Sequence, residues 1–268
     1  METTVNQRWR DKVATYMQAD KVFNPARFWV GELPFADAKK FVTTHHYMGS
    51  MSASRVRFGL YHSTLEDEEL VGVAVFDHGM NPAILTKTFD TLPAKDAQEV
   101  TLNLARFVML DAVKWNGETW FLARCFEELR KKGYLGVVSF SDPVVRRHEG
   151  SVTFKGHIGT IYQAHNAAYL GHSSPKTKHV FPDGREFCDR TASKARNGEV
   201  GETYACQLLI DQGADAPWDD RAEWVRHWRA KLCQRVNHPG NYKYAWWFPK
   251  KHAPEWERQK YPKVTIEL

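Results

Sequence analysis

Apolar and polar positions along this chain recur with two periods, one typical of strands and one typical of helices. Residues 55–61 alternate, and residues 70–76 form a continuous apolar run; the acidic turn between them predicts a hairpin whose second strand is central in a sheet. Four other segments have the length and composition of strands: residues 27–30, 99–111, 135–140 and 242–248.

Helical spacing appears in five places. An apolar stripe of Phe121, Leu122, Cys125, Phe126 and Leu129 predicts a helix that Gly133 closes. The same spacing favours helices over residues 3–19, 34–42, 158–170 and 220–235. In the last of these, we interpret Trp224 and Trp228 as core residues rather than as platforms for nucleic-acid bases.

Strands that alternate with helices predict a mixed α/β (α+β) fold, with a central mixed sheet flanked by helices. A Pro-Asp-Gly turn at residues 182–184, followed by short helices, predicts a hairpin and helical insertion before the last strand. We divide the chain into a core over residues 1–171, the insertion with the final core strand over 172–249, and a basic, loosely attached tail over 250–268. Residues 77–98 show no clear period and are expected to form a long connection.

The composition is that of a globular protein, with 43% hydrophobic and 26% charged residues among 268. No apolar run has the length of a membrane span, and the polar first residues do not resemble a signal peptide, so we expect a cytoplasmic protein that does not contact membranes. The four cysteines form no CxxC pair, which argues against a zinc knuckle or a disulfide framework.

The net charge of +5 is unevenly distributed along the chain. Residues 172–268 contain 17 basic and 13 acidic side chains, against 20 and 19 in residues 1–171. A basic second half is compatible with a polyanionic partner, although runs of charge are more often solvated surface.

The most informative corner of the sequence follows the strand at residues 135–140. Asp142-Pro143 ends that strand, so a carboxylate lies at its carboxyl end, where α/β enzymes bind ligands. Asp142 can stabilise a turn through its own backbone, or it can accept a proton in catalysis. A basic loop and a segment with two tyrosines, Tyr162 and Tyr169, come next.

A second polar junction lies between the strand at 99–111 and the helix that follows it. Asn116, Gly117 and Thr119 stand where the first N–H groups of that helix would favour an anion such as a phosphate.

Four motifs occur in a fixed order along the middle of the chain. They are His45-His46-Tyr47, the strand at 104–111, Asn116-Gly117-Glu118-Thr119-Trp120-Phe121-Leu122, and Asp142-Pro143 followed by Gly-x-Ile-Tyr-Gln-Ala-x-Asn-x-x-Tyr-x-Gly at 159–171. This ordered set resembles the Mom family of bacteriophage DNA-modification proteins, which is related to the GNAT acyltransferases. The resemblance implies a GNAT-like sheet and a reaction on DNA that adds a carbamoylmethyl group to adenine N6 and protects the DNA from restriction.

The resemblance also implies a set of site residues. Asp142, Tyr162, Tyr47 and Arg106 correspond to catalytic positions, and Asn116, Gly117 and Thr119 to a site for the group donor. His46, Tyr47, Asp142 and Tyr162 correspond to positions proposed to bind iron, and their oxygen and nitrogen ligands suit that metal. The junction at Asn116 departs from the GNAT pyrophosphate pattern, so the donor is either acetyl-CoA or another acyl or aminoacyl compound.

The implied partner is double-stranded DNA, with a homodimer as a further option. Basic residues that flank the Asp142 corner are candidate phosphate contacts: Arg146, Arg147, Lys155, Lys176, Lys178 and Arg185. Two other interpretations keep the same fold. One is an acyl-CoA-dependent N-acyltransferase that acts on an amine of a hypermodified base, a small molecule or a protein; the other is a DNA-binding module without catalysis.

Overall fold

The computed structural model describes residues 5–10, 13–18, 23–46, 49–64, 67–114, 116–148, 150–154, 156–249, 251 and 253–263, with the backbone alone for residues 5–10, 13–18, 146–148 and 151–154. The chain forms two compact units. The sheet unit comprises Met1–Ser141, Ile158–Gly171 and Tyr242–Leu268, and the insertion unit comprises Asp142–His157 and His172–Asn241. The segment Asp142–His157, which follows the fifth predicted strand, therefore belongs to the insertion unit.

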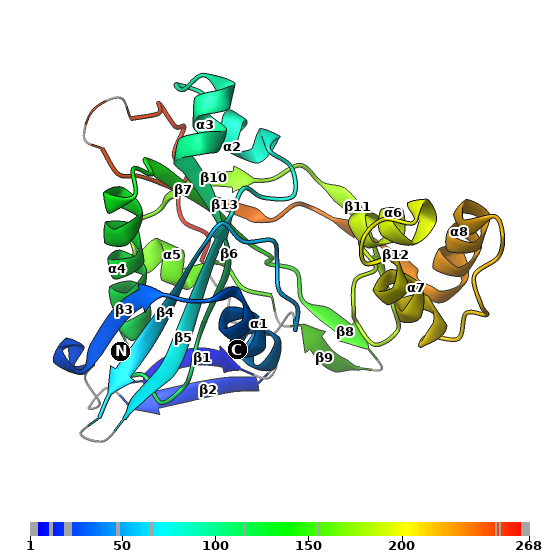
Figure 1. Cartoon of the computed structure of the whole chain (residues 1–268), viewed down its shortest axis with the longest axis horizontal. Helices are drawn as coiled ribbons and strands as arrows, with labels where there is room; N and C mark the ends of the chain where they lie inside the picture. The colour runs from blue at the N-terminus through cyan, green and yellow to red at the C-terminus, as the bar shows by residue number, and fades with distance from the viewer. Residues whose placement is uncertain are drawn as a thin grey trace. The chain divides into compact units, whose positions relative to one another are not determined.

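Seven strands form the sheet of the sheet unit, in the order β10–β13–β7–β6–β5–β4–β3 (Figure 1). β6 and β7 are parallel, whereas β3–β4, β4–β5, β5–β6 and β7–β13 are antiparallel, so the predicted mixed sheet is confirmed. The strands are β3 (Phe28–Glu32), β4 (Val56–Ser63), β5 (Glu68–Asp77), β6 (Thr101–Met109), β7 (Gly136–Ser141), β10 (Ala168–His172) and β13 (Tyr242–Trp247).

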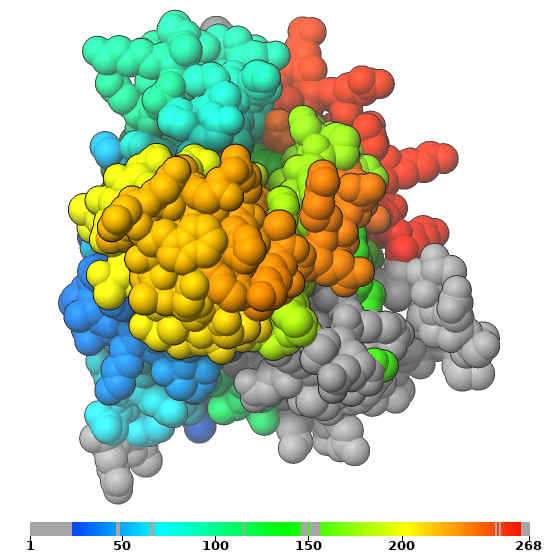
Figure 2. Space-filling model, turned by 90° about the vertical axis from the view of Figure 1, so that its right-hand side faces the viewer, coloured from blue at the N-terminus to red at the C-terminus, as the bar shows by residue number. Residues whose placement is uncertain are grey.

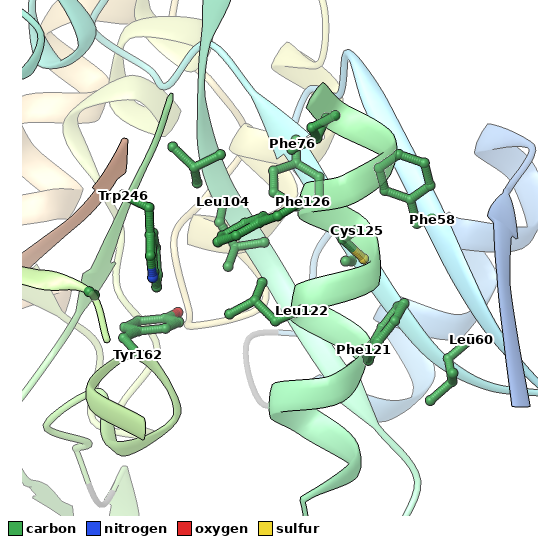
Figure 3. Packing of buried hydrophobic residues seen from close by; sticks show 14 of the residues in the cluster. Phe58, Leu60, Phe76, Leu104, Phe121, Leu122, Cys125, Phe126, Tyr162 and Trp246 are labelled. Atoms are coloured by element: carbon green, nitrogen blue, oxygen red, sulfur yellow. The ribbon is translucent and has the colours of Figure 1, made fainter. Parts of the chain in front are cut away.

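Helix α4 (Gly117–Lys131) connects β6 to its parallel neighbour β7 and lies against one face of the sheet. The predicted stripe is confirmed, because Phe121, Leu122, Cys125, Phe126 and Leu129 are all buried. Figure 3 shows four of these side chains, Phe121, Leu122, Cys125 and Phe126, in the core with sheet residues such as Phe58 and Phe76. Truncation of a phenylalanine in such a core typically costs about 3–5 kcal/mol.

Helix α1 (Phe35–His45) lies on the other face of the sheet. Successive residues of β5 point to opposite faces: Ala74 and Phe76 belong to the core beneath α4, whereas Val73 and Val75 pack with Phe41 of α1. The continuous apolar run in this strand is therefore explained by helices on both faces.

The connection before β6 is more regular than its sequence indicates. The long connection expected over residues 77–98 is present and contains two short helices, α2 (Ala83–Thr88) and α3 (Ala94–Val100), the second of which continues up to β6. Each is about two turns or less, which is too short for a periodic pattern to stand out.

The segment with the two tyrosines also differs from the expected single helix. Helix α5 covers only Thr160–Ala164, and Tyr169 lies on strand β10. Asn166 adopts a left-handed conformation with φ 57°, which ends the helix. Both tyrosine rings nevertheless contact Tyr244 of β13.

The predicted amphipathic helix over residues 3–19 is also wrong. This segment forms two antiparallel strands, β1 (Val5–Arg10) and β2 (Val13–Gln18), paired from Val5↔Gln18 to Arg10↔Val13. Its apolar residues fit a period of two as well as a helical period, so the pattern alone does not decide between the two.

The C-terminal tail is not loosely attached within residues 253–263. Trp256 Nε1 donates to Thr88 O at 2.7 Å, Gln259 N donates to Tyr169 O at 2.9 Å, and Tyr261 Oη donates to Ala167 O at 2.6 Å. Figure 1 and Figure 2 show this red segment beside α2 and α3.

The insertion unit contains two small antiparallel sheets and three helices. The sheets are β8 (Arg146–His148) with β9 (Ser151–Phe154), and β11 (Lys176–Val180) with β12 (Gln234–His238). Its helices in the described residues are α6 (Asp189–Asn197), α7 (Glu202–Ile210) and α8 (Arg221–Leu232). A short 3-10 helix, η1 (Pro25–Arg27), belongs to the sheet unit. The Pro-Asp-Gly turn is present, but β11 pairs mainly with β12 and makes only one bridge, Val180↔Glu186, across that turn.

The insertion unit has a hydrophobic core of its own. Trp224 and Trp228 are buried in it, as predicted, together with Phe181 and Phe187. Asp215 accepts hydrogen bonds from the indoles of Trp218, Trp224 and Trp228 at 3.1, 3.0 and 2.7 Å. None of the helices in the described part of the chain has the length and apolar composition to cross a membrane.

Candidate functional site

The parallel strands β6 and β7 separate at their carboxyl ends. Their pairing runs from Thr101↔Gly136 to Leu104↔Ser139, whereas β6 continues to Met109. At the same point β6 contains a bulge opposite β5: Val75 pairs with Arg106 and Phe76 with Leu104, so Ala105 has no counterpart. We call this divergence the β6–β7 fork. Ligands in α/β proteins commonly bind where parallel strands end, and bulges re-aim side chains beside such sites.

The bulge determines which way Arg106 points. Leu104, before the bulge, belongs to the core beneath α4; Val108, after it, packs on the α1 side of the sheet. Arg106 Nη1 donates to Ala105 O at 2.8 Å, and Arg106 Nε donates to Ser50 O at 2.9 Å. The guanidinium thus bonds the carbonyl of the bulged residue, Ala105, and that of Ser50, which is four residues after His46.

Tyr162 lies at the base of the fork. Its hydroxyl is hydrogen-bonded to the side chain of Ser139, whose Oγ is 3.1 Å from Leu104 O. The ring packs against Tyr244 and Trp246, and Figure 3 shows the hydroxyl directed toward the core. Burial raises the pKa of Tyr162, which the bond to Ser139 only partly offsets, so the phenol is protonated at neutral pH.

The start of α4 is arranged more tightly than a generic anion site. Asn116 is left-handed at φ 71° and makes no side-chain cap. Gly117 N donates to Lys114 O at 3.1 Å, and Thr119 Oγ1 donates to Asn116 O at 3.1 Å. A Cβ at Gly117 would lie 2.5 Å from Val113 Cγ1, so only glycine fits. One of the N–H groups expected to face a donor is thus used within the loop.

Asp142, in the insertion unit, lies in a nearly buried group of charged side chains. Lys178 Nζ is 2.8 Å from Asp142 Oδ2 and 3.3 Å from Glu186 Oε2. Asp142 Oδ1 accepts from His238 Nε2 at 2.8 Å and from Val144 N at 3.0 Å. The side chains of Lys178 and His238 are only 5% and 1% exposed.

Backbone geometry fixes the tautomer of His238. Gly240 N donates to His238 Nδ1 at 3.1 Å, and an amide N–H can only donate, so the ring proton lies on Nε2 and points to Asp142. A second histidine, His157, follows nearby, and its backbone N–H donates to the backbone carbonyl of Asp142 at 2.8 Å. Burial lowers the pKa of His157 to about 4, against an opposing effect of the Asp142 charge, so this imidazole is neutral at pH 7.

The structure places the other predicted residues in different settings. Lys176 is exposed, whereas the ammonium of Lys178 is committed to two carboxylates and Arg185 pairs with Asp183 at 2.7 Å. His46 follows the end of α1, with its N–H bonded to Val42 O. Tyr47, Lys155 and the side chains of Arg146 and Arg147 lie outside the described residues, so their roles stay predictions.

A hollow of about 350 Å³ lies beside α1. Its walls include His45 but not His46, and they are formed by Asp37, Lys40, Phe41, Thr44, His45 and Leu70.

The described residues do not assemble an iron site by themselves. Among them, no three histidine, cysteine or acidic side chains lie close enough to hold a metal ion. Of the set predicted to bind iron, Asp142 belongs to the insertion unit and His46 and Tyr162 to the sheet unit, and Tyr47 lies outside the described residues, so this set stays a prediction. We therefore derive no chemical step through a metal.

The comparison with known families agrees with the order of motifs. The model of the Mom protein family matches residues 27–263, which is most of the chain. The chain belongs to the Mom protein family. That membership supports a role in the modification of bacteriophage DNA. A search of curated proteins found no match.

Several residues of this Mom protein's candidate site could not have been named from the sequence. Ser139 lies inside an apolar strand, and Glu186 and His238 follow no motif. The role of His238 follows only from the pairing of β11 with β12, which brings Lys178 and His238 to one side of a two-stranded sheet. The local sequence around each of them gives no indication of this.

Proposed function

We propose that this protein transfers a carbamoylmethyl group to the exocyclic N6 of adenine in phage DNA, and that the β6–β7 fork is where the group donor binds. The family match supports the DNA substrate, since it includes both strands of the fork and the whole insertion unit. The single observation that favours this location is the coincidence of the end of β6–β7 pairing with the bulge at Ala105.

The chemistry requires a proton acceptor. The N6 lone pair of adenine is delocalised into the ring, so the nitrogen attacks the methylene carbon of the donor only as it loses a proton. In our proposal the N6–carbon bond forms, the bond from that carbon to the leaving group breaks, and Asp142 takes the proton. The ammonium of Lys178, 2.8 Å away, stabilises the ionised carboxylate before the reaction.

The remaining residues complete this proposed site. Arg106 holds the bulge, Tyr162 closes the base of the fork, and Tyr47 with His46 follows α1. Iron at His46, Tyr47, Asp142 and Tyr162 stays a prediction, as do the homodimer and the donor at Asn116, Gly117 and Thr119. The setting we infer is the cytoplasm of the infected bacterium, where phage DNA is exposed to restriction enzymes.

The reacting adenine must leave the base stack to meet a side chain at a strand end. Proteins that modify bases flip them into a pocket and hold the backbone with basic residues. Arg146 and Arg147 of β8, Lys155, Arg185 and the exposed Lys176 are the proposed phosphate contacts, and the paired state of Lys178 makes it a less suitable one.

Mass spectrometry of nucleosides tests the proposal directly. DNA from bacteria that express the protein is digested to nucleosides, and we expect an adenosine with the added mass of a carbamoylmethyl group. Asp142→Ala is expected to lower its yield by about a hundredfold or more, the usual contribution of a general base. Unmodified nucleosides in the wild type would refute the proposed function, and a fully active Asp142→Ala would refute the role of Asp142.

A second candidate function is acyl-CoA-dependent N-acyl transfer to an amine. The parallel β6–α4–β7 unit with its fork and bulge is similar to the GNAT arrangement and favours this alternative. The bond from Gly117 N to Lys114 O argues against it, because that N–H would otherwise face the pyrophosphate. Tight binding of acetyl-CoA, measured by calorimetry, would favour the acyltransferase; absence of binding together with modified adenosine would favour carbamoylmethyl transfer.

A further inference from the structure

The two-stranded sheet β11–β12 has two faces of different character. Lys178, Val180 and His238 are buried on one face, beside Asp142. On the other face Thr177 is directly opposite Asn237, and His179 is opposite Arg235. Arg235 and Asn237 are exposed, and Thr177 and His179 are half-buried. The inner face is thus fixed by the ion pairs of Asp142, and the outer face is held rigidly toward solvent.

The outer face carries one exposed cation and no acidic residue of its own strands. Arg235 of β12 is exposed on this face, whereas Lys176 is opposite His238 and therefore lies on the inner face. Arg229 of α8 lies against the His179 end, with Nη2 2.6 Å from His179 Nδ1, and also pairs with Asp189. Burial and the neighbouring Arg229 lower the pKa of His179, so its ring is neutral at pH 7. A neutral imidazole can both donate and accept hydrogen bonds.

The side chains on this face are of the types that recognise base edges. Arginine pairs with guanine O6 and N7, asparagine pairs with adenine N6 and N7, and threonine contacts either edges or the thymine methyl group. The Thr177 and Asn237 side chains lie within 3.5 Å of each other, which orders the amide. By contrast, a surface that only attracts phosphate needs lysine and arginine alone.

The dimensions of the sheet also match duplex DNA. Two paired strands lie about 4.8 Å apart, and with their side chains they fit the major groove, which is about 12 Å wide. Five residues of a strand extend over about 17 Å, the length of roughly five base pairs. An RNA duplex does not offer this fit, because its major groove is narrow and deep.

We propose that the outer face of β11–β12 enters the major groove of duplex DNA, where Thr177, Arg235 and Asn237 contact base edges. The choice of DNA as partner rests on the proposed function. The inference goes beyond it by naming the element that selects which adenines are modified.

Selection of bound duplexes from a random pool tests this proposal on the full-length protein. Arg235→Ala and Asn237→Ala are each expected to relax the base preference at one position by about tenfold, the discrimination typical of a bidentate contact. Arg226→Ala is the matched control. Arg226 is also exposed, but it lies on α8 and pairs with Glu223, so its removal is expected to leave the preference unchanged. If Arg235→Ala lowers the melting temperature, Arg235→Gln must relax the same preference.

Two results would overturn the proposal. The first is that Arg235→Ala and Asn237→Ala both keep the base preference of the wild type. The second is that the wild type binds duplex DNA, duplex RNA and polyglutamate with equal affinity, which would indicate attraction to polyanions only. Binding needs no donor, so the two proposals fail separately. Unmodified nucleosides with a preference that Asn237→Ala relaxes would refute the transfer and leave the DNA contact standing.

Discussion

The buried ammonium of Lys178 governs the electrostatics around Asp142. It shares its charge between Asp142 and Glu186, with side chains 12% and 19% exposed, in a place where water compensates charge poorly. Taking such a group out of water is costly, and the cost is recovered only through close, hydrogen-bonded partners. Removal of one partner therefore leaves the others without compensation.

We expect Lys178→Met to lower the free energy of unfolding by about 3 kcal/mol, because it leaves two half-buried carboxylates without their shared cation. The double variant Lys178→Met/Asp142→Leu should recover part of this loss, since a buried pair replaced by apolar groups is often tolerated. Chemical denaturation followed by tryptophan fluorescence measures both. A double variant less stable than the single one would show that the pair does not act as a unit.

The same residue shows where sequence reasoning stops. The type of Lys178 suggests a phosphate contact, and nothing nearby indicates otherwise, because Asp142 is 36 positions away and His238 is 96 positions from Asp142. The position of Asp142 at a strand end could be predicted, since an apolar run followed by Asp-Pro has a local meaning. Its partners could not, because they depend on the pairing of two distant strands.

At the scale of elements, length decides what a pattern predicts. Helix α4 has 15 residues, and all five predicted members of its stripe are buried. Helix α5 has only five residues, and one left-handed asparagine after it turns the chain into β10. The basic composition of the tail suggested a mobile end, but its few aromatic side chains determine its position.

The tail secures the segment that contains Tyr162. Gln163 Nε2 donates to Pro262 O of the tail at 3.3 Å and to Ile158 O, just before α5, at 3.0 Å. Trp256 anchors the tail further along, where its ring lies 5.8 Å from that of Phe89. The half-buried Trp256 is therefore the side chain on which the attachment depends most.

We expect Trp256→Ala to destabilise the sheet unit by about 2 kcal/mol, through lost apolar contact and the lost bond to Thr88 O. The amide hydrogens of residues 160–170 should exchange faster, because the tail no longer covers them. Glu257→Ala, an exposed change in the same segment, is the control and should have no effect. Unchanged exchange in Trp256→Ala would mean that the tail rests on α5 without stabilising it.

At the scale of the whole molecule, two sets of cores stabilise the fold. The sheet unit buries apolar residues on both faces of its sheet, and the insertion unit has a core of its own around Trp224 and Phe187. The core of the sheet unit could be predicted from the order of strands and helices, because each element has its own period. The insertion unit was harder to predict, since its chain comes from two separate segments, Asp142–His157 and His172–Asn241.

Asp215 offers a way to separate the two units experimentally. Burial raises the pKa of this carboxyl, but three indole N–H groups outweigh that effect and the pKa lies below its usual value, so the charge is present throughout the neutral range. We expect Asp215→Ala to speed amide exchange in α6, α7 and α8 by about tenfold or more, because the buried indoles of Trp224 and Trp228 lose their acceptor. Exchange in β5 and β6 should stay at the wild-type rate.

Asp211→Ala provides the matched control, because Asp211 is an exposed acid that accepts a hydrogen bond from the nearby Gln207. Equal acceleration in β5 and in α8 would contradict two separately stabilised cores and would mean that the protein opens as one cooperative body.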